Sequence, residues 1–268
     1  MKVLCLGGGP AGLYFAISMK LRDPSHQVTV LERNRANDTF GWGVVLSDDA
    51  LARMQTNDPV STEAIRANFV YWDDIAVVRG TERTVSGGHG FAGIGRRQML
   101  TLLQDRARAL GVDLRFETEF KSASDYAPDY DLVVACDGIN SAVRREFAHV
   151  FRPDIDMRLC KFVWLGTHAK FDDAFTFIFE KTEHGWVWAH AYQFDADTAT
   201  FIVECSQATW DAWGFDAMTK EDTVATCQRI FAGHLGGHEL MSNAAHLRGS
   251  AVWMNFPRVI CDTWYHGN

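Results

Sequence analysis

A glycine-rich stretch near the start of the chain, GGGPAG at 7–12, constrains the fold more than any other feature. The apolar run KVLCL at 2–6 precedes it and is typical of a buried parallel strand. A helix-like stretch from Ala11 to Leu21 follows it, and the β-branched run QVTVLE at 27–32 is typical of a second strand. The start of the chain therefore predicts a βαβ unit and an α/β, Rossmann-like fold.

The glycines of this stretch match the pattern G-x-G-x-x-G. Gly7 would let the chain turn sharply out of the strand, Gly9 would let a pyrophosphate approach the backbone, and Gly12 would let the helix pack close to the sheet. The N-terminus of the following helix, with Pro10 and Ala11 in its first turn, offers free N–H groups and a positive dipole to the same anion. We therefore expect Gly7, Gly9, Pro10, Ala11 and Gly12 to bind a dinucleotide.

An acidic residue stands where such folds hold a ribose. Glu32 lies about twenty residues after Gly12, at the end of the second strand, where its carboxylate can accept hydrogen bonds from ribose hydroxyls. The same carboxylate argues against a ribose that carries a 2′-phosphate, which disfavours NADP and leaves FAD and NAD open. Arg33 is a candidate contact to the adenosine phosphate, and a surface charge is the alternative.

The character of the chain changes after about Pro153. Before it, a helix-like segment from about Arg97 to Leu110 and the apolar run DLVVACDG at 131–138 continue the α/β pattern. After it, DAFTFIFE, WVWAHAYQF and TFIVEC predict an antiparallel meander with short polar turns. We expect two interleaved domains: a nucleotide-binding domain from residues 1–71 and 96–152, a β-sheet substrate domain from 72–95 and 153–256, and a return towards the first domain over 257–268.

Aromatic residues alternate along the second strand of this meander. Trp186, Trp188, His190 and Tyr192 fall on one face by the two-residue period of a strand. Trp186, Trp188 and Tyr192 are candidates for a wall against the substrate, and His190 is a candidate catalytic proton acceptor. Ordinary core packing between the sheet and its helices is the alternative for all four.

Composition argues against several partners. The formal net charge of −8 offers no basic footprint for nucleic acid or an anionic membrane. The six cysteines are scattered without a C-x-x-C pair, so we expect neither disulfides nor a metal site. No apolar run approaches the ~18 residues of a membrane span. The apolar stretch of MKVLCL is too short for a signal peptide, so we expect none. We expect a cytoplasmic protein.

Three motifs, in this order, resemble the flavin-dependent aromatic hydroxylases of the para-hydroxybenzoate hydroxylase type: GGGPAGLYFA with VLERN, GRRQMLTLL, and DLVVACDGINSAVRREF. The resemblance implies FAD as cofactor and NAD(P)H as co-substrate. It implies that Arg96 contacts the FAD phosphates and that Asp137 and Gly138 belong to a motif that serves FAD and the pyridine nucleotide. Trp42 and Val44 occupy the segment where the family has arginines that touch the flavin, so a flavin-facing role for them is a hypothesis.

Within this family the chain is most similar to salicyloyl-CoA 5-hydroxylases and to the monooxygenase part of anthraniloyl-CoA monooxygenases. The motifs that carry this similarity include DTFGWGVVLSD, FEKTEHGW, AHAYQFD, TFIVE and LMSNAAHLRGSAVW. The resemblance implies that an aromatic acyl-CoA is hydroxylated by O2 through a flavin C4a-hydroperoxide. Hydroxylation of a free aromatic or indolic metabolite and a non-catalytic nucleotide-binding fragment are the alternatives.

One departure from the family concerns the end of the chain. The family has a later Gly-Asp motif on a closing strand, whose aspartate binds FAD, and helices after it. This chain contains no Gly-Asp pair and ends at TWYHGN. We therefore expect a C-terminally truncated chain that lacks part of the flavin site and, by itself, is inactive or holds FAD weakly.

Overall fold

The computed structural model describes residues 1–36, 38–39, 41–171, 174–242 and 252–268. Three of the sequence stretches above reach beyond this part. Position 40 of DTFGWGVVLSD, position 173 of DAFTFIFE and positions 243–251 of LMSNAAHLRGSAVW lie outside the described residues.

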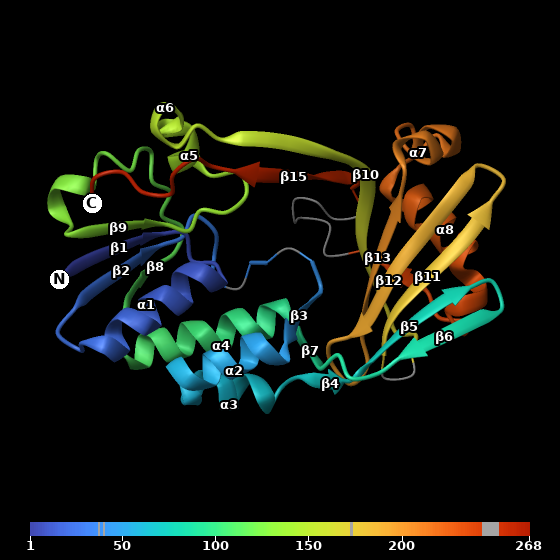
Figure 1. Ribbon diagram of the computed structural model, residues 1–268, viewed down its shortest axis with the longest axis horizontal. Coiled ribbons are helices and arrows are strands. Elements are labelled where there is room, and N and C mark those ends of the chain that lie inside the picture. Colours follow the sequence, from blue (N-terminus) through green and yellow to red (C-terminus); the bar gives the residue numbers. More distant parts are fainter. Residues whose placement is uncertain (37, 40, 172–173, 243–251) are drawn as a thin grey trace.

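A four-stranded parallel sheet forms one end of the molecule (Figure 1). Its order is β8-β2-β1-β9, with β1 at Lys2–Leu6, β2 at Gln27–Leu31, β8 at Asp113–Arg115 and β9 at Leu132–Ala135. Helix α1 (Pro10–Arg22) connects β1 to β2, as the sequence predicts, and α4 (Arg96–Ala109) packs beside it. Apolar residues of both helices and of the sheet share one core, so the expected α/β fold is confirmed.

The opposite face of this sheet has a smaller core. Leu4, Leu6 and Leu31 pack there against Val143 and Ala123. Val143 belongs to the short helix α5 (Ala142–Glu146), which follows β9 and is followed by α6 (Ala148–Phe151). Glu146 ties α5 down, because its carboxylate accepts bonds from the Ser122 hydroxyl at 2.6 Å and the Ala123 N–H at 2.8 Å.

A large, mostly antiparallel sheet forms the other end (Figure 1). Its order is β14-β10-β13-β12-β11-β5-β6, and β15 also pairs with β10. Strands β11, β12 and β13 form the predicted meander, while β5 joins β11 in the one parallel pairing of this sheet among the described residues. The strands are β5 (Asp74–Arg79), β6 (Glu82–Ser86), β10 (Asp154–Thr167), β11 (Ala174–Thr182), β12 (Gly185–Gln193), β13 (Ala199–Cys205), β14 (Leu240–Met241) and β15 (Met254–Ile260).

In the described part of the chain, helices cover one face of the large sheet. Helix α8 (Lys220–Phe231) and α7 (Gln207–Trp213) pack on the face that carries Val187, Ala189 and Ala191 of β12. Phe201 of β13 and Phe231 of α8 meet edge to face in this core, with ring centroids 5.3 Å apart and both side chains fully buried. The small residues of β12 thus let the helix approach the sheet closely.

A third, three-stranded sheet lies between the two ends. Its order is β3-β7-β4, with β3 at Gly43–Ser47, β7 at Phe91–Gly95 and β4 at Val70–Trp72. Thus of residues 72–95, β5 and β6 join the large sheet, whereas β7 pairs with β3 and β4. Strand β7 leads directly into α4, so this small sheet places the start of that helix.

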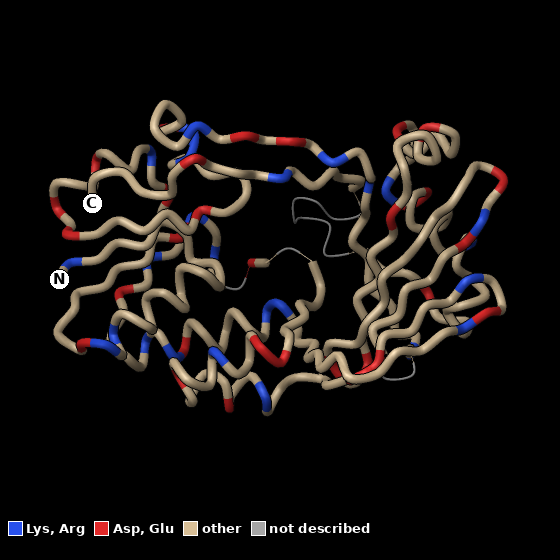
Figure 2. The backbone as a smooth tube through the Cα atoms, viewed as in Figure 1, with Lys and Arg blue, Asp and Glu red and all other residues tan. Residues whose placement is uncertain are grey.

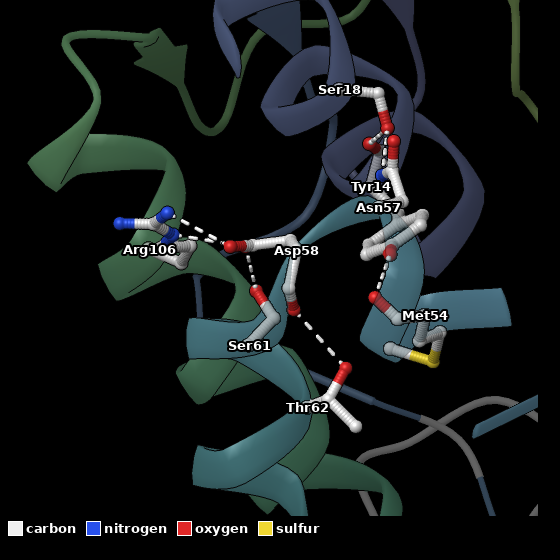
Figure 3. Close-up of polar contacts among 8 residues, drawn as sticks. All are labelled: Tyr14, Ser18, Met54, Asn57, Asp58, Ser61, Thr62 and Arg106. Carbon is white, nitrogen blue, oxygen red and sulfur yellow. Dashed lines mark hydrogen bonds and ion pairs between the residues drawn. The ribbon is translucent and has the colours of Figure 1, made fainter. Parts of the chain in front are cut away.

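Two helices beside α4 are fastened by a buried ion pair. Helix α2 (Asp48–Asn57) ends at Asp58, and α3 (Pro59–Arg66) begins there. The Asp58 carboxylate accepts bonds from Arg106 Nε at 2.9 Å and Nη2 at 2.8 Å, and from the Ser61 hydroxyl at 2.6 Å (Figure 3). The Asp58 side chain is 1% exposed. Burial alone would raise the pKa of Asp58, but the bonds from Arg106 and Ser61 outweigh it and lower that pKa.

Strand β10 runs from one end of the molecule towards the other, with β15 beside it (Figure 1). Acidic and basic residues are interspersed along this pair of strands, as along the helices near the parallel sheet (Figure 2). In the part of the chain that the structure describes, every helix is too short or too polar to cross a membrane.

Candidate functional site

A cavity of about 290 Å³ opens at the carboxyl ends of β1, β2 and β9. Ligands of doubly wound folds bind at this edge of the sheet. The glycine loop, the end of β2, the start of α4 and the segment after β9 line the cavity. Eight residues that the sequence analysis selected are among the lining residues: Gly7, Gly9, Pro10, Glu32, Arg33, Arg96, Asp137 and Gly138.

The three glycines of the motif have different surroundings. Gly7 has a φ of +116°, and a Cβ there would lie 2.2 Å from the Cys136 carbonyl oxygen. A Cβ on Gly12 would lie 2.0 Å from the Gly7 carbonyl oxygen, whereas a Cβ on Gly9 would meet no atom within 4 Å. Gly7 and Gly12 are therefore required by packing, and Gly9 leaves open space beside the cavity.

Helix α1 begins beside the cavity without a side-chain cap. Gly9 is the N-cap residue, no side chain caps the helix, and Pro10 occupies the first turn. Ala11 and Gly12 lie in that first turn but are not among the residues that line the cavity. The first N–H groups of a helix without a cap are a binding site for an anion.

Glu32 is held against the glycine loop. Its Oε2 accepts a bond from the Gly8 N–H at 2.9 Å, and its Oε1 accepts bonds from the N–H and the side-chain amide of Asn34, both at 2.8 Å. These contacts fix the carboxylate at the cavity. The sequence analysis missed Gly8 and Asn34, although both flank predicted residues. Arg33 is exposed at the mouth of the cavity.

Arg96 is a half-buried cation at the first turn of α4. Its backbone N–H donates to the Trp42 carbonyl at 2.9 Å, and its guanidinium carbon lies 5.9 Å from the centre of the Trp164 ring. Burial lowers the pKa of Arg96 from its ordinary value. Among the described residues, no carboxylate forms an ion pair with Arg96. A half-buried cation of this kind on a cavity wall fits an anionic group such as a phosphate.

Asp137 and Gly138 follow β9 at the cavity. Asp137 Oδ2 accepts bonds from the Ala142 N–H at 2.6 Å and the Val143 N–H at 3.3 Å, which fixes the start of α5. Gly138 has a φ of +82°, and a Cβ there would meet no atom within 4 Å. Asp137 therefore fixes the start of α5, and Gly138 leaves open space beside its backbone at the cavity.

Trp42 and Val44 are not among the lining residues. The Trp42 ring packs on β10, where a Cβ on Gly166 would lie 2.6 Å from it. Val44 packs against the apolar core between the parallel sheet and its helices. The structure thus places neither side chain on the wall of this cavity, and a role for them at the flavin stays a prediction.

The four aromatic candidates of β12 lie on the face of the large sheet opposite α8. Cross-strand pairs of rings cover this face: Phe175 with Tyr192 at 5.2 Å, Phe177 with His190 at 4.8 Å, and Phe179 with Trp188 at 6.5 Å between centroids. Glu204 of β13 stands opposite Trp188 on the same face. We call these six residues together with Glu204 the aromatic face. Its rings are not part of the core beneath α8, because successive residues of a strand point to opposite sides.

The four candidates differ in what they can offer a ligand. Trp186 is 42% exposed next to the hairpin turn, and Tyr192 is 4% exposed. The Tyr192 hydroxyl donates to the Gly43 carbonyl at 3.0 Å, so it is committed to the backbone of β3. Trp188 Nε1 donates to Glu204 Oε2 at 2.9 Å. Burial lowers the pKa of His190, and the nearby Glu204 carboxylate opposes part of that shift.

Glu204 is the polar residue of this face that the sequence analysis missed. A signal was present, because Glu204 interrupts the apolar run TFIVEC. Its partner Trp188 stands opposite it in the register of β12 and β13.

Comparisons with known proteins agree with this geometry. No protein-family model matches the chain. The chain is 40% identical to salicyloyl-CoA 5-hydroxylase of a Streptomyces species, over the whole chain but only 52% of that protein. It is 31% identical to protodeoxyviolaceinate monooxygenase of Chromobacterium violaceum, over the whole chain and 70% of that protein. In fold it is similar to 2-methyl-3-hydroxypyridine-5-carboxylic acid oxygenase, with a TM-score of 0.77, 18% identity, and coverage of 99% of this chain and 73% of that one.

Proposed function

This chain belongs to the flavin-dependent aromatic monooxygenase family, and on that premise we propose that it hydroxylates an aromatic acyl-CoA with FAD, NAD(P)H and O2. The 40% identity to a salicyloyl-CoA 5-hydroxylase supports the thioester part of this proposal. The observation that carries the proposal is Arg96, a half-buried cation without a carboxylate partner among the described residues, on the same cavity as Glu32 and the start of α1.

The cavity offers groups that match a flavin dinucleotide. Gly9 and the N-terminus of α1 would bind the pyrophosphate, and Arg96 would add a cation beside it. Glu32, fixed by Gly8 and Asn34, would accept bonds from ribose hydroxyls. Bound FAD supplies the electron transfer from NAD(P)H and the activation of O2.

The aromatic face would hold the substrate ring. Its rings offer an apolar surface against which a planar ring would pack, and this contact would exclude water. The lowered pKa of His190 favours a neutral imidazole, which is able to accept a proton from a ring substituent at neutral pH. Tyr192 would contribute its ring but not its hydroxyl to substrate binding, because that hydroxyl donates to the Gly43 carbonyl.

The test uses the purified full-length protein. We expect it to bind FAD in nearly equimolar amount and to oxidise NAD(P)H faster when salicyloyl-CoA or anthraniloyl-CoA is present, with formation of a hydroxylated thioester. A full-length protein that binds no FAD, or whose NAD(P)H oxidation no aromatic compound stimulates, contradicts the proposal.

A second candidate is a hydroxylase of a free aromatic or indolic metabolite. The 31% identity to protodeoxyviolaceinate monooxygenase over 70% of its length favours it. Parallel assays with the free acids, an indolic compound and the CoA thioesters separate the two, because only an acyl-CoA enzyme prefers the thioesters. A non-catalytic chain would show no flavin colour after purification.

A further inference from the structure

Glu204 contributes a carboxylate to the aromatic face. It stands opposite Trp188 on β12 and opposite Phe162 on β10, and its side chain is half-buried. His190 lies next to it, close enough for the Glu204 charge to act on the pKa of the imidazole. An ionised side chain on such an apolar surface loses hydration unless polar partners replace water.

The partners of Glu204 leave part of this carboxylate free. Trp188 Nε1 donates to Oε2 at 2.9 Å, whereas a carboxylate accepts about four hydrogen bonds. Among the described residues no Lys or Arg pairs with Glu204. Lys161, on the neighbouring strand, is bonded to Asn255 Oδ1 at 2.8 Å and lies over the Trp210 ring at 4.6 Å. Glu204 thus retains acceptor capacity, and the aromatic face around it suits a ligand ring.

We propose that Glu204 determines specificity by accepting a hydrogen bond from an O–H or N–H group on the substrate ring. The proposal rests on the proposed function, since it presumes that the ring lies on the aromatic face. Apolar walls hold a ring without selecting its substituents, whereas a polar group that stays unpaired with the wrong ligand rejects it strongly. Trp188 is the positioning residue, because its indole N–H fixes one oxygen of Glu204.

The experiment measures equilibrium binding to the full-length, FAD-loaded protein by calorimetry. The probes are the 2-hydroxybenzoyl, 2-aminobenzoyl and unsubstituted benzoyl CoA thioesters, each also tested as the free acid. We expect a donor-bearing ring to bind at least about tenfold more tightly than the unsubstituted ring, as a single charge-assisted hydrogen bond allows. Whether the hydroxyl or the amino probe binds more tightly shows which donor Glu204 accepts.

Two substitutions make the test specific. Glu204→Leu should reduce the preference to less than about twofold through loss of that bond while leaving the unsubstituted ring bound as before. Glu180→Gln is the control, because Glu180 pairs with His234 at 2.5 Å on the other face of the sheet, and it should preserve the preference.

The outcomes separate this proposal from the proposed function. Equal affinity for all three rings in the unmodified protein, or equal weakening of all three by Glu204→Leu, overturns the role of Glu204. Binding of the free acids but not of the thioesters overturns the acyl-CoA substrate, and the preference is then measured on the acids. If no probe binds in either series, both proposals are wrong.

Discussion

Two arginines of helix α4 show how differently the same side chain is used ten residues apart. Arg106, near the end of the helix, gives both its Nε and one Nη to the buried Asp58 carboxylate (Figure 3). Arg96, in the first turn, lines the cavity, and its guanidinium carbon lies 5.9 Å from the centre of the Trp164 ring. An arginine paired with a buried carboxylate contributes to folding, whereas a half-buried arginine without such a pair among the described residues is available to a ligand.

The largest effect should come from breaking the ion pair between Arg106 and Asp58. Asp58→Asn leaves the Arg106 cation largely buried without its counterion, and we expect the free energy of unfolding to fall by about 3 kcal/mol. Chemical denaturation of the apoprotein measures this. Asp49→Asn breaks the exposed pair with Arg53, 3.0 Å apart, and should leave the denaturation midpoint unchanged. An equal loss in both variants would contradict the distinction.

The next effect concerns the unpaired arginine. Arg96→Gln removes the cation that would face the FAD phosphates, so we expect FAD to bind about 10- to 100-fold more weakly, as for loss of a charged hydrogen bond. The stability of the apoprotein should change by less than about 0.5 kcal/mol. Flavin fluorescence titration and denaturation measure the two quantities. Arg97→Gln, at the exposed next residue, is the control and should alter neither.

Tyr192 extends the comparison to a hydroxyl on the aromatic face. Because this hydroxyl is bonded to Gly43, Tyr192→Phe should lower the free energy of unfolding by about 1 kcal/mol and leave ligand affinity nearly unchanged. Denaturation and binding titrations of the same preparation test this. A loss of substrate binding without a loss of stability would show instead that the Tyr192 hydroxyl contacts the ligand.

The titration of Asp58 has the smallest effect on stability at ordinary pH, because the carboxyl group is ionised there and protonates only in acid. Its lowered pKa means that its contribution to stability is complete above the ordinary pKa of about 4 and is lost as the pH falls through the lower, folded-state value. Denaturation midpoints of the unmodified protein and of Asp58→Asn should therefore converge on acidification. A constant difference down to low pH would show that the charge of Asp58 is not responsible.

The sequence predicted the elements whose signals are local. Strand β1, helix α1 and strand β2 follow one another within 31 residues, and the glycines mark the turn between the first two. The alternation in WVWAHAYQF also predicted which side chains share a face of β12. Of the predicted site, Glu32, Arg96 and Asp137 lie on one cavity. Glu32 and Asp137 follow parallel strands that end at the same edge of one sheet, whereas Arg96 begins the helix that follows β7 of the three-stranded sheet.

The features that could not be predicted depend on residues far apart in the chain. Asp58 and Arg106 are separated by 48 positions, and Gly43 and Tyr192 by 149. The alternation of residues along β12 shows that the strand has two faces. It does not show which face the helices cover, because that depends on the side of the sheet on which α8 packs. Likewise, the pairing of Val44 with Ile94 of β7 became visible only with the three-stranded sheet.

The route of the chain through the large sheet limits how this protein can be recombined with its relatives. Strands β5 and β6 enter that sheet before α4, and β10 to β14 enter it after β9. A contiguous cassette that begins at β10 would leave behind the partner of β11 along Ala174–Phe179 and expose the edge of that strand. A chimera that exchanges substrate preference therefore needs junctions on both sides of α4. Tyr192 and Gly43 should come from the same parent, because the Tyr192 hydroxyl donates to the Gly43 carbonyl.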